Sequence, residues 1–388
     1  MLGEDTMKHL HFYQFIWRLL WPLERLWIQR KFNVDAEVCK ESGPFLVLCN
    51  HNTDWDPLLL ASAFPRYMSF VASEHIFRWG FAGKLIVALM APIARLKGKT
   101  AGDTAMTMLR RLRKGISVAM FAEGNRSFNG LTNEILPATG KLARSSGVKL
   151  ITYRLEGGYF TSPRWSDGLR RGKMTGRVVR IYMPEELKAM RADEVNAAIR
   201  RDLSADAYAV QRGLMIPFRG KNLAEHLETV LCICPRCGMI GTLKSEGDIL
   251  RCACGFSVRY TEYGFLEGDG APFDNITDWD RVQTEQLIAL AEAAGDGPIF
   301  SDDGMDLKEV FPDTHTDAPI GSGSMTLYAD RLECCGQVFP LAELGGFSLV
   351  RAQTVDLSCG GRFFEITSPQ VRCTRKYMIV IDHLKQTR

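Results

Sequence analysis

Strand-like apolar runs alternate with helical runs along the first half of the chain, and this alternation restricts the fold more than any other feature. The strand-like runs occupy residues 45–49, 68–72, 116–122, 149–154 and 177–182. Helical periodicity occupies residues 81–90, 104–113, 140–145 and 192–211. Such a pattern predicts an α/β domain over residues 36–221, with helices flanking a mainly parallel or mixed sheet.

An amphipathic helical segment is expected before this domain, within residues 1–35. Its apolar side chains recur at helical spacing, at Phe12, Phe15, Ile16, Leu19, Leu20, Leu23 and Trp27. Pro22 predicts a kink or a division of the helix. We interpret the segment as an interfacial helix at a membrane surface; the alternative is a helix packed on its own domain.

The ends and charges of the chain limit its location and partners. No run of about 18 uncharged apolar residues occurs, so no transmembrane span is expected. The acidic residues Glu4 and Asp5 argue against a signal peptide. Residues 1–221 carry 34 Lys and Arg against 20 Asp and Glu, a net charge of +14, whereas residues 222–388 carry 14 against 25, a net charge of −11. A basic first half suits an anionic partner such as lipid phosphate, although a solvated basic face is the alternative.

Two residues with acid–base chemistry follow the first strand. His51 lies just beyond the run 45–49, and Asp56 lies five residues later, after a turn. Ligands of open α/β sheets usually bind at the carboxyl ends of the strands. A carboxylate that contacts one imidazole nitrogen would fix the tautomer and leave the other nitrogen free to accept a proton.

A second polar turn follows the run 116–122. Glu123, Gly124, Asn125 and Arg126 are consecutive there. Glycine lets backbone amides approach an anion, and arginine offers a bidentate fork for phosphate. Arg95 follows another apolar run, so both arginines are expected at strand-to-loop positions of one sheet.

The ordered segments NHxxxxD, PIAR and FAEGNRS resemble the glycerolipid acyltransferase family, that is, 1-acylglycerol-3-phosphate acyltransferases and their relatives. The resemblance covers roughly residues 10–215. It implies that His51 is the general base and that Asp56 orients and stabilises its imidazole. The acceptor hydroxyl would then attack an acyl thioester directly, with acyl-CoA or an acyl carrier protein as donor.

The same resemblance implies roles for the residues around the dyad. Glu123, Gly124, Asn125 and Arg126 would position the acceptor, and Arg95 would bind its phosphate. Ala122 and Asn125 depart from the usual proline and threonine of the family motif, which affects the identity of the acceptor more than the reaction.

Five of the 11 cysteines lie between Cys232 and Cys254, which favours a metal site over a disulfide framework. Residues 230–260 resemble a zinc ribbon in which Cys234, Cys237, Cys252 and Cys254 would hold structural Zn²⁺, with Cys232 as a substitute ligand. Free buried cysteines without metal are the alternative. The surrounding half of the chain is acidic, so nucleic acid is not an expected partner.

Two further segments complete the expected organisation. Residues 261–322 contain an acidic stretch and are expected to form a linker with one helix at 280–294. Residues 323–388 predict a small antiparallel β domain, with strands near 325–328, 331–334, 347–350, 363–366 and 376–381. This tail weakly resembles a pleckstrin-homology or GRAM module. Arg372, Arg375 and Lys376 would be its headgroup ligands, unless they form an ordinary basic strand edge.

These features together predict a phospholipid-biosynthesis acyltransferase, peripheral or monotopic on the cytoplasmic face of a membrane. Its expected acceptor is 1-acylglycerol-3-phosphate, with another lysophospholipid or a glycerol-phosphate as the alternative. A catalytically inactive zinc-ribbon adaptor is the alternative from another class, and the ribbon or the β tail would then contact a protein partner.

Overall fold

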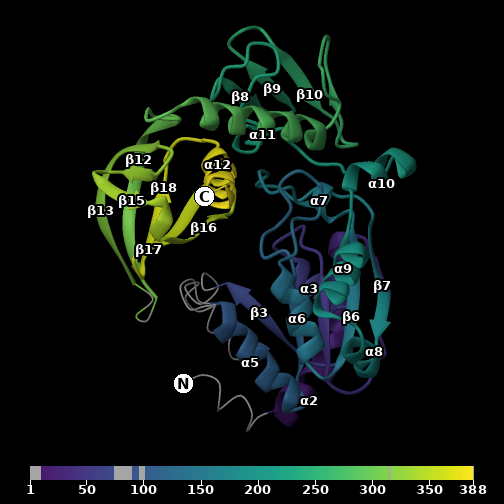
Figure 1. Cartoon of the computed structure of the whole chain (residues 1–388). Helices are drawn as coiled ribbons and strands as arrows, with labels where there is room; N and C mark the ends of the chain where they lie inside the picture. Colours follow the sequence, from purple (N-terminus) through teal and green to yellow (C-terminus); the bar gives the residue numbers. More distant parts are fainter. Residues whose placement is uncertain (1–9, 74–89, 96–100, 313, 315, 388) are drawn as a thin grey trace. The chain divides into compact units, whose positions relative to one another are not determined.

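The computed structural model describes residues 10–73, 90–95, 101–312, 314 and 316–387 (Figure 1). The chain divides into two compact units. Unit 1 comprises Met1–Pro163 and Leu169–Arg219, and unit 2 comprises Arg164–Gly168 and Gly220–Arg388. The helix expected over residues 81–90 lies outside the described residues except at Met90.

Unit 1 contains a seven-stranded sheet of order β1-β7-β6-β2-β5-β3-β4. Its strands are β1 (Val34–Ala36), β2 (Phe45–Cys49), β3 (Met68–Ser73), β4 (Ile93–Arg95), β5 (Ser117–Phe121), β6 (Lys149–Glu156) and β7 (Met174–Tyr182). Neighbouring strands run parallel, except for the antiparallel pair β6 and β7. The predicted α/β class with a mixed sheet is confirmed.

Strand β2 lies at the centre of the sheet and is buried on both faces. Phe45, Val47 and Cys49 pack on one side with α2 (Leu10–Phe32) and α3 (Asp56–Ala61). Leu46 and Leu48 pack on the other side with α5 (Ala101–Arg113), α6 (Pro137–Ser145) and α9 (Ala192–Leu203). A strand covered on both faces is apolar throughout, which explains the continuous run FLVLC. The remaining helices of unit 1 are α7 (Gly158–Thr161), α8 (Pro184–Ala189) and α10 (Ala207–Leu214).

Helix α2 is one continuous helix and is not divided at Pro22. On its inward side Ile28 and Phe32 are buried in the core, the indole of Trp17 donates to the carbonyl of Phe64 (3.1 Å), and Arg25 donates to the carbonyls of Ser62 and Ala36. Its outward side carries a stripe of exposed apolar side chains, Phe12, Phe15, Leu19, Leu20, Leu23, Leu26 and Trp27. Across the described part of the chain, no helix is long and apolar enough to span a bilayer.

The single helix expected over residues 192–211 is wrong, because the chain forms α9 and α10 with a break at 204–206. Asp206 starts α10 by accepting a hydrogen bond from the backbone N–H of Ala209 (2.9 Å). In the break, the hydroxyl of Thr132 accepts from the N–H of Ala205 (2.8 Å). Capping by Asp206 therefore outweighs the helical periodicity on either side.

The first part of unit 2 is a small antiparallel sheet of order β11-β10-β9-β8. Its strands are β8 (Leu243–Glu246), β9 (Ile249–Cys252), β10 (Ser257–Tyr260) and β11 (Leu266–Glu267), and a 3₁₀ turn, Leu227–Thr229, precedes them. Helix α11 (Ile276–Ala293) follows, capped by Asn275, so it begins four residues before the expected start.

The second part of unit 2 is a seven-stranded antiparallel sheet of order β15-β14-β13-β12-β18-β17-β16, followed by α12 (Arg375–Gln386). Its strands are β12 (Phe300–Phe311), β13 (Thr316–Leu327), β14 (Arg331–Cys334), β15 (Gln337–Pro340), β16 (Leu344–Val350), β17 (Thr354–Cys359) and β18 (Arg362–Thr367), and a 3₁₀ turn, Leu341–Glu343, lies between β15 and β16. The expected linker over residues 261–322 is therefore wrong. Met305 and Leu307 of β12 are buried and Asp306 lies between them, so a strong charge did not prevent strand formation.

The strand expected over residues 376–381 is also wrong, because these residues lie in α12. Tyr377, Val380 and Ile381 are buried at the i, i+3, i+4 spacing of a helix. The basic residues expected at a lipid surface have acidic partners instead. Arg375 is buried and pairs with Asp280, whereas Lys376 (2.7 Å) and Arg372 (3.3 Å) pair with Asp302.

Candidate active site

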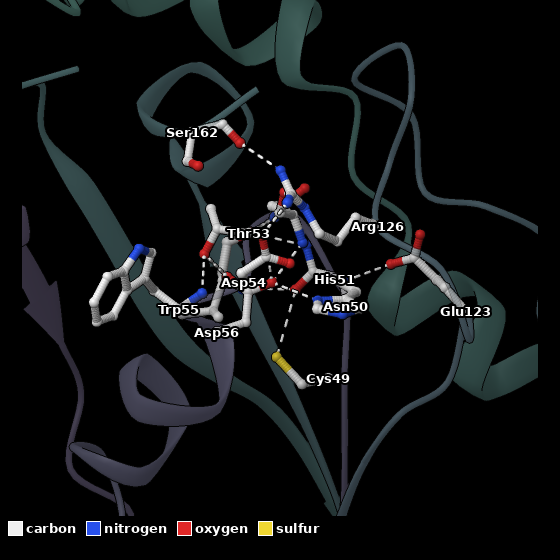
Figure 2. Close-up of polar contacts among 12 residues, drawn as sticks. Cys49, Asn50, His51, Thr53, Asp54, Trp55, Asp56, Glu123, Arg126 and Ser162 are labelled. Carbon is white, nitrogen blue, oxygen red and sulfur yellow. Dashed lines mark hydrogen bonds and ion pairs between the residues drawn. The ribbon is translucent and has the colours of Figure 1, made fainter. Parts of the chain in front are cut away.

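The turn between β2 and α3 brings His51 and Asp56 into contact, as Figure 2 shows. Nδ1 of His51 lies 2.9 Å from Oδ2 of Asp56. The start of the turn is fixed by Asn50, whose side chain donates to the carbonyl of Leu155 and accepts from its N–H, both at 2.8 Å. These two bonds hold the end of β2 against the neighbouring strand β6.

Asp56 is fully buried and is surrounded by hydrogen-bond donors. Its Oδ2 accepts from the backbone N–H groups of Asn52 (2.5 Å) and Thr53 (2.9 Å), and its Oδ1 accepts from the hydroxyl of Thr53 (2.8 Å). Backbone N–H groups can only donate, so the carboxylate is an acceptor throughout. Nδ1 of His51 therefore carries the proton in this contact, and in the neutral imidazole Nε2 is then the acceptor nitrogen.

The imidazole of His51 is partly accessible. Its side chain is 19% exposed, and its ring stacks on that of Phe121, with centroids 4.4 Å apart. No described residue forms a hydrogen bond with Nε2. This nitrogen is therefore available to a hydroxyl that enters from solvent, which is the geometric requirement for a general base.

Glu123 contacts the backbone of the same turn. Its Oε1 accepts from the N–H of His51 (2.7 Å), and its Oε2 accepts from the N–H (2.6 Å) and the side-chain amide (3.1 Å) of Asn133. Burial raises the pKa of Glu123 to about 8, and these N–H donors oppose the shift. Both oxygens of this carboxyl thus accept hydrogen bonds from backbone N–H groups.

Arg95 and Gly124 lie together near the end of the sheet. Arg95 is the last residue of β4 and is exposed, and no described carboxylate pairs with it. Gly124 has a φ of +71°, and a Cβ atom there would lie 2.8 Å from Nη1 of Arg95. Asn125 is half-buried, and its carbonyl accepts from the side chain of Asn133 (3.0 Å). A glycine thus leaves room for the guanidinium beside the polar turn.

Arg126 is buried, and its guanidinium contacts the turn that carries the dyad (Figure 2). Nε donates to the carbonyl of Asn52 (3.2 Å), Nη1 to the carboxylate of Asp54 (2.5 Å), and Nη2 to the carbonyl of Ser162 (3.0 Å). Each nitrogen of the guanidinium therefore donates a hydrogen bond to an acceptor within the protein.

Sequence reasoning missed four residues that shape this site: Asn52, Thr53, Asp54 and Asn133. Thr53 carries a usable signal, because a threonine hydroxyl often forms a local hydrogen bond in the turn before a helix, and the first residue of α3 is Asp56. Asn52 and Asn133 act in part through backbone N–H groups, which every residue but proline has, so their identity gives no signal. The pairing of Asp54 with Arg126 joins residues 72 positions apart.

The four cysteines predicted as metal ligands do come together in unit 2. The sulfur atoms of Cys234, Cys237, Cys252 and Cys254 all lie within 4.8 Å of one another. Sγ of Cys234 is 3.7 Å from that of Cys254, and Sγ of Cys237 is 3.8 Å from that of Cys252. Four thiolates at about 2.3 Å from a tetrahedral Zn²⁺ are about 3.8 Å apart, so the donor set and its spacing fit this metal. Cys232 is buried elsewhere, close to Cys373.

Comparison with known proteins gives three results. The family model described as Acyltransferase matches residues 31–156. A curated protein of Mycoplasma genitalium, "Probable 1-acyl-sn-glycerol-3-phosphate acyltransferase", is 26% identical over 119 residues, which cover 29% of this chain and 44% of that protein. The crystal structure of the 1-acyl-sn-glycerophosphate (LPA) acyltransferase PlsC from Thermotoga maritima is similar with a TM-score of 0.40 and 17% identity, over 47% of this chain and 78% of that one.

The matched segments set the extent of the assignment. The chain spans less than half the length of the curated Mycoplasma relative. The family model covers β2, the turn with His51 and Asp56, β5 with the Glu123–Arg126 turn, and β6 up to residue 156. The part of this chain that is similar to the acyltransferase family is therefore residues 31–156, which include the turns with His51, Asp56 and Glu123.

Proposed function

We propose that this protein transfers a fatty acyl group from a thioester to the hydroxyl of a lysophospholipid. The observation that carries the proposal is the contact of His51 Nδ1 with the buried Asp56 carboxylate, which leaves Nε2 accessible. The setting in an acyltransferase-family domain supports the reaction class, and the name of the Mycoplasma relative supports 1-acylglycerol-3-phosphate as the acceptor.

In the proposed reaction, the acceptor hydroxyl donates its proton to Nε2 of His51 while its oxygen attacks the thioester carbonyl. The tetrahedral intermediate collapses with loss of the thiolate, and the imidazolium returns the proton to that sulfur. Asp56 stabilises the imidazolium while it exists. A base positioned in this way typically contributes about 10²–10⁴-fold in rate. The thiol is that of coenzyme A or of an acyl carrier protein.

Acceptor recognition is assigned to the rim of the site. Arg95 is exposed and lies against Gly124, so its guanidinium can approach a phosphate from solvent. The proposal therefore favours an acceptor that carries a phosphate, and the first candidate is lysophosphatidate, acylated at its free sn-2 hydroxyl. Another lysophospholipid or glycerol-phosphate is the alternative acceptor.

We also propose that α2 places the protein on a membrane, peripherally or monotopically, at the cytoplasmic face. Phe15 and Leu23 are each 66% exposed and Leu19 is 63% exposed, on a helix whose Trp17 and Arg25 bond to backbone carbonyls of unit 1. A contiguous apolar stripe turned to water is unfavourable in solution and is stabilised by insertion into the headgroup boundary. Trp17 and Trp21 do not contribute, because their indoles bond to backbone carbonyls of unit 1.

The membrane proposal is tested by vesicle flotation. The double variant Leu19→Ser, Leu23→Ser is expected to lose co-flotation with phospholipid vesicles. The matched control is Leu290→Ser, which removes a leucine that is 43% exposed on α11. Equal flotation of the double variant and the wild type would refute a lipid-facing role for α2.

The cysteine cluster is proposed to bind one structural Zn²⁺ per chain, because its sulfur spacing matches a tetrahedral site. Elemental analysis of purified protein should give about one equivalent of zinc. Cys237→Ser should lose the metal and destabilise unit 2, whereas Cys335→Ser, outside the cluster, should retain it. Wild-type protein without tightly bound zinc would contradict the proposal.

The reaction itself is tested by product analysis with purified protein. Lysophosphatidate, other lysophospholipids and glycerol 3-phosphate are offered with acyl-CoA and with acyl carrier protein. We expect an acylated phospholipid from wild type and none from His51→Ala, with an unchanged circular dichroism spectrum. Turnover by His51→Ala at the wild-type rate would refute the role of His51. Acyl-donor binding without turnover by wild type would instead support an inactive adaptor.

A further inference from the structure

Three aromatic rings, those of Trp27, Phe32 and Trp55, form a box around the ammonium group of Lys31 near the end of helix α2. Nζ of Lys31 lies 3.7 Å from the ring centroid of Trp55 and 4.7 Å from that of Trp27. Phe32 is the third ring, at 5.4 Å. The centroid of Trp55 is also 6.1 Å from that of Trp27 and 5.4 Å from that of Phe32. The aromatic box therefore joins two rings of α2 to one ring of the turn between β2 and α3.

The rings are the partners of this ammonium group. Among the described residues, no carboxylate forms an ion pair with Lys31. A lysine ammonium within about 6 Å of a ring centroid is attracted by the negative face of the ring, most strongly for tryptophan. Phe32 is 3% exposed, so one wall of the box is anchored in the core of unit 1. The ammonium therefore attracts the ring of Trp55 toward α2, in addition to the packing between the rings.

Trp55 also belongs to the hydrogen-bonded turn of the dyad (Figure 2). Its N–H donates to the hydroxyl oxygen of Thr53 (3.0 Å), and that hydroxyl donates to Oδ1 of Asp56 (2.8 Å). Its carbonyl accepts from two N–H groups in the first turn of α3, at 3.0 and 2.9 Å. The placement of this main chain therefore affects the carboxylate that pairs with His51.

The residue type at position 55 suits the ring contact and not helix capping. Trp55 occupies the N-cap of α3, and its side chain forms no cap hydrogen bond. Serine, threonine, aspartate or asparagine at an N-cap stabilises a helix by accepting from one of its first N–H groups, which an indole cannot do. The beginning of α3 thus lacks this stabilisation and has the contact with α2 in its place.

We propose that Lys31 and Trp55 are positioning residues, through which helix α2 holds the turn that carries His51 and Asp56 in its catalytic geometry. The inference rests on the proposed acyl transfer for its kinetic tests. Both residues act through the main chain of Trp55 and the hydroxyl of Thr53. A looser turn would weaken the contact between Asp56 and His51, so kcat would fall while the acceptor KM is retained.

Lys31→Met is the central variant, because methionine keeps an apolar side chain in the box and removes the charge. The assay uses short-chain lysophosphatidate and short-chain acyl-CoA as monomers in solution, so attachment to a membrane does not affect the rate. Lys31→Met should lower kcat by about 3–10-fold and leave the acceptor KM within about twofold. Lys31→Arg should restore kcat, because a guanidinium also binds aromatic faces.

Arg30→Met is the matched control, because Arg30 is the adjacent exposed cation of α2 and lies outside the box. It should retain the wild-type kcat. Equal kcat for Lys31→Met and wild type overturns the proposal. An equal fall in kcat for Arg30→Met also overturns it, because the effect would then come from the charge of α2 in general.

A double-variant cycle tests whether Lys31 acts through Trp55. Trp55→Phe keeps a ring in the box, whereas Trp55→Leu removes it and should lower kcat further than Trp55→Phe does. In the Trp55→Leu protein, Lys31→Met should have no additional effect on kcat, because the ammonium no longer has a ring partner on the turn. Fully additive losses of kcat would overturn the proposal.

A readout without turnover separates this inference from the proposed function. The N–H groups of Thr53 and Trp55 donate to Asp56 and to the Thr53 hydroxyl only while the turn is held, so their hydrogen exchange should accelerate in Lys31→Met and not in Arg30→Met. Unchanged exchange at both amides in Lys31→Met refutes positioning even in an active enzyme. Accelerated exchange in a protein without acyl transfer would refute the proposed function and retain the positioning role.

Discussion

Replacing Asp56 by asparagine would remove the negative charge opposite His51 while an oxygen acceptor stays in the same place. The amide oxygen can take the position of Oδ2, where it accepts from Asn52, Thr53 and His51, and the amide nitrogen then faces the hydroxyl of Thr53. The tautomer of His51 is therefore preserved. Only the attraction between the carboxylate and the forming imidazolium is lost.

The size of this loss follows from the geometry. Charges centred about 4 Å apart interact by about 4 kcal/mol at an effective dielectric constant near 20. If roughly half of the charge has formed in the transition state, about 2 kcal/mol is lost, which lowers kcat by about 30-fold. Asp56→Ala also leaves two N–H groups and a hydroxyl without an acceptor, at about 1 kcal/mol or more each. We therefore expect Asp56→Ala to unfold roughly 6–12 °C earlier, and Asp56→Asn within about 2 °C of wild type.

The assay combines initial rates of acyl transfer with thermal unfolding followed by circular dichroism. Asp56→Asn separates charge from hydrogen bonding, and Asp56→Ala removes both. Full activity of Asp56→Asn would show that the carboxylate charge does not assist His51. An Asp56→Ala variant as stable as wild type would show that the donors around this carboxylate are not held as described.

Three further variants test other contacts. The Glu24 carboxyl is buried with no hydrogen-bond partner among the described residues, and burial raises its pKa from 4.5 to about 8. The free energy of unfolding of wild type should therefore fall, relative to that of Glu24→Gln, as the pH rises from 4.5 to 8. Equal pH dependence of the two proteins in urea unfolding would contradict this. Thr53→Val removes the hydroxyl that donates to Asp56 (2.8 Å) and should cost about 1–2 kcal/mol in urea unfolding, with a few-fold fall in kcat; an unchanged midpoint would count against that bond. Gly124→Ala places a methyl group 2.8 Å from Nη1 of Arg95 and should raise the acceptor KM, so an unchanged KM would argue against a role of that guanidinium in acceptor binding.

The α/β part of the fold was predictable because its signal is local. The run FLVLC of β2 is apolar at every position, which is the pattern expected of a short strand covered on both faces. The errors arose where local preference and tertiary packing disagree. The β-branched residues around Val380 suggest a strand, but burial at i, i+3 and i+4 makes this segment a helix. The acidic β12 was mistaken for a linker because its four acidic residues obscure the pattern of its buried Met305, Leu307 and Val310.

The candidate site was predictable as a set of residues, but not as a set of contacts. The spacing of His51 and Asp56 across a turn indicated their pairing, and the structure places them 2.9 Å apart. Arg126 was interpreted as a phosphate ligand because arginine in a glycine-containing turn suggests one. Its acceptors are mainly backbone carbonyls, which no sequence pattern records, so its internal bonding could not be anticipated.

The bond between the N–H of His51 and Glu123 has a consequence for the temperature dependence of the rate. The imidazole is restrained through its ring by Asp56 and through its main chain by Glu123. The conformational freedom that a mobile base would lose on reaching the transition state has already been lost during folding. Motion of this side chain should therefore add little to the activation entropy, and the barrier at the proton-transfer step should be mainly enthalpic. Loosening either restraint would transfer part of that cost to an entropic penalty in each turnover.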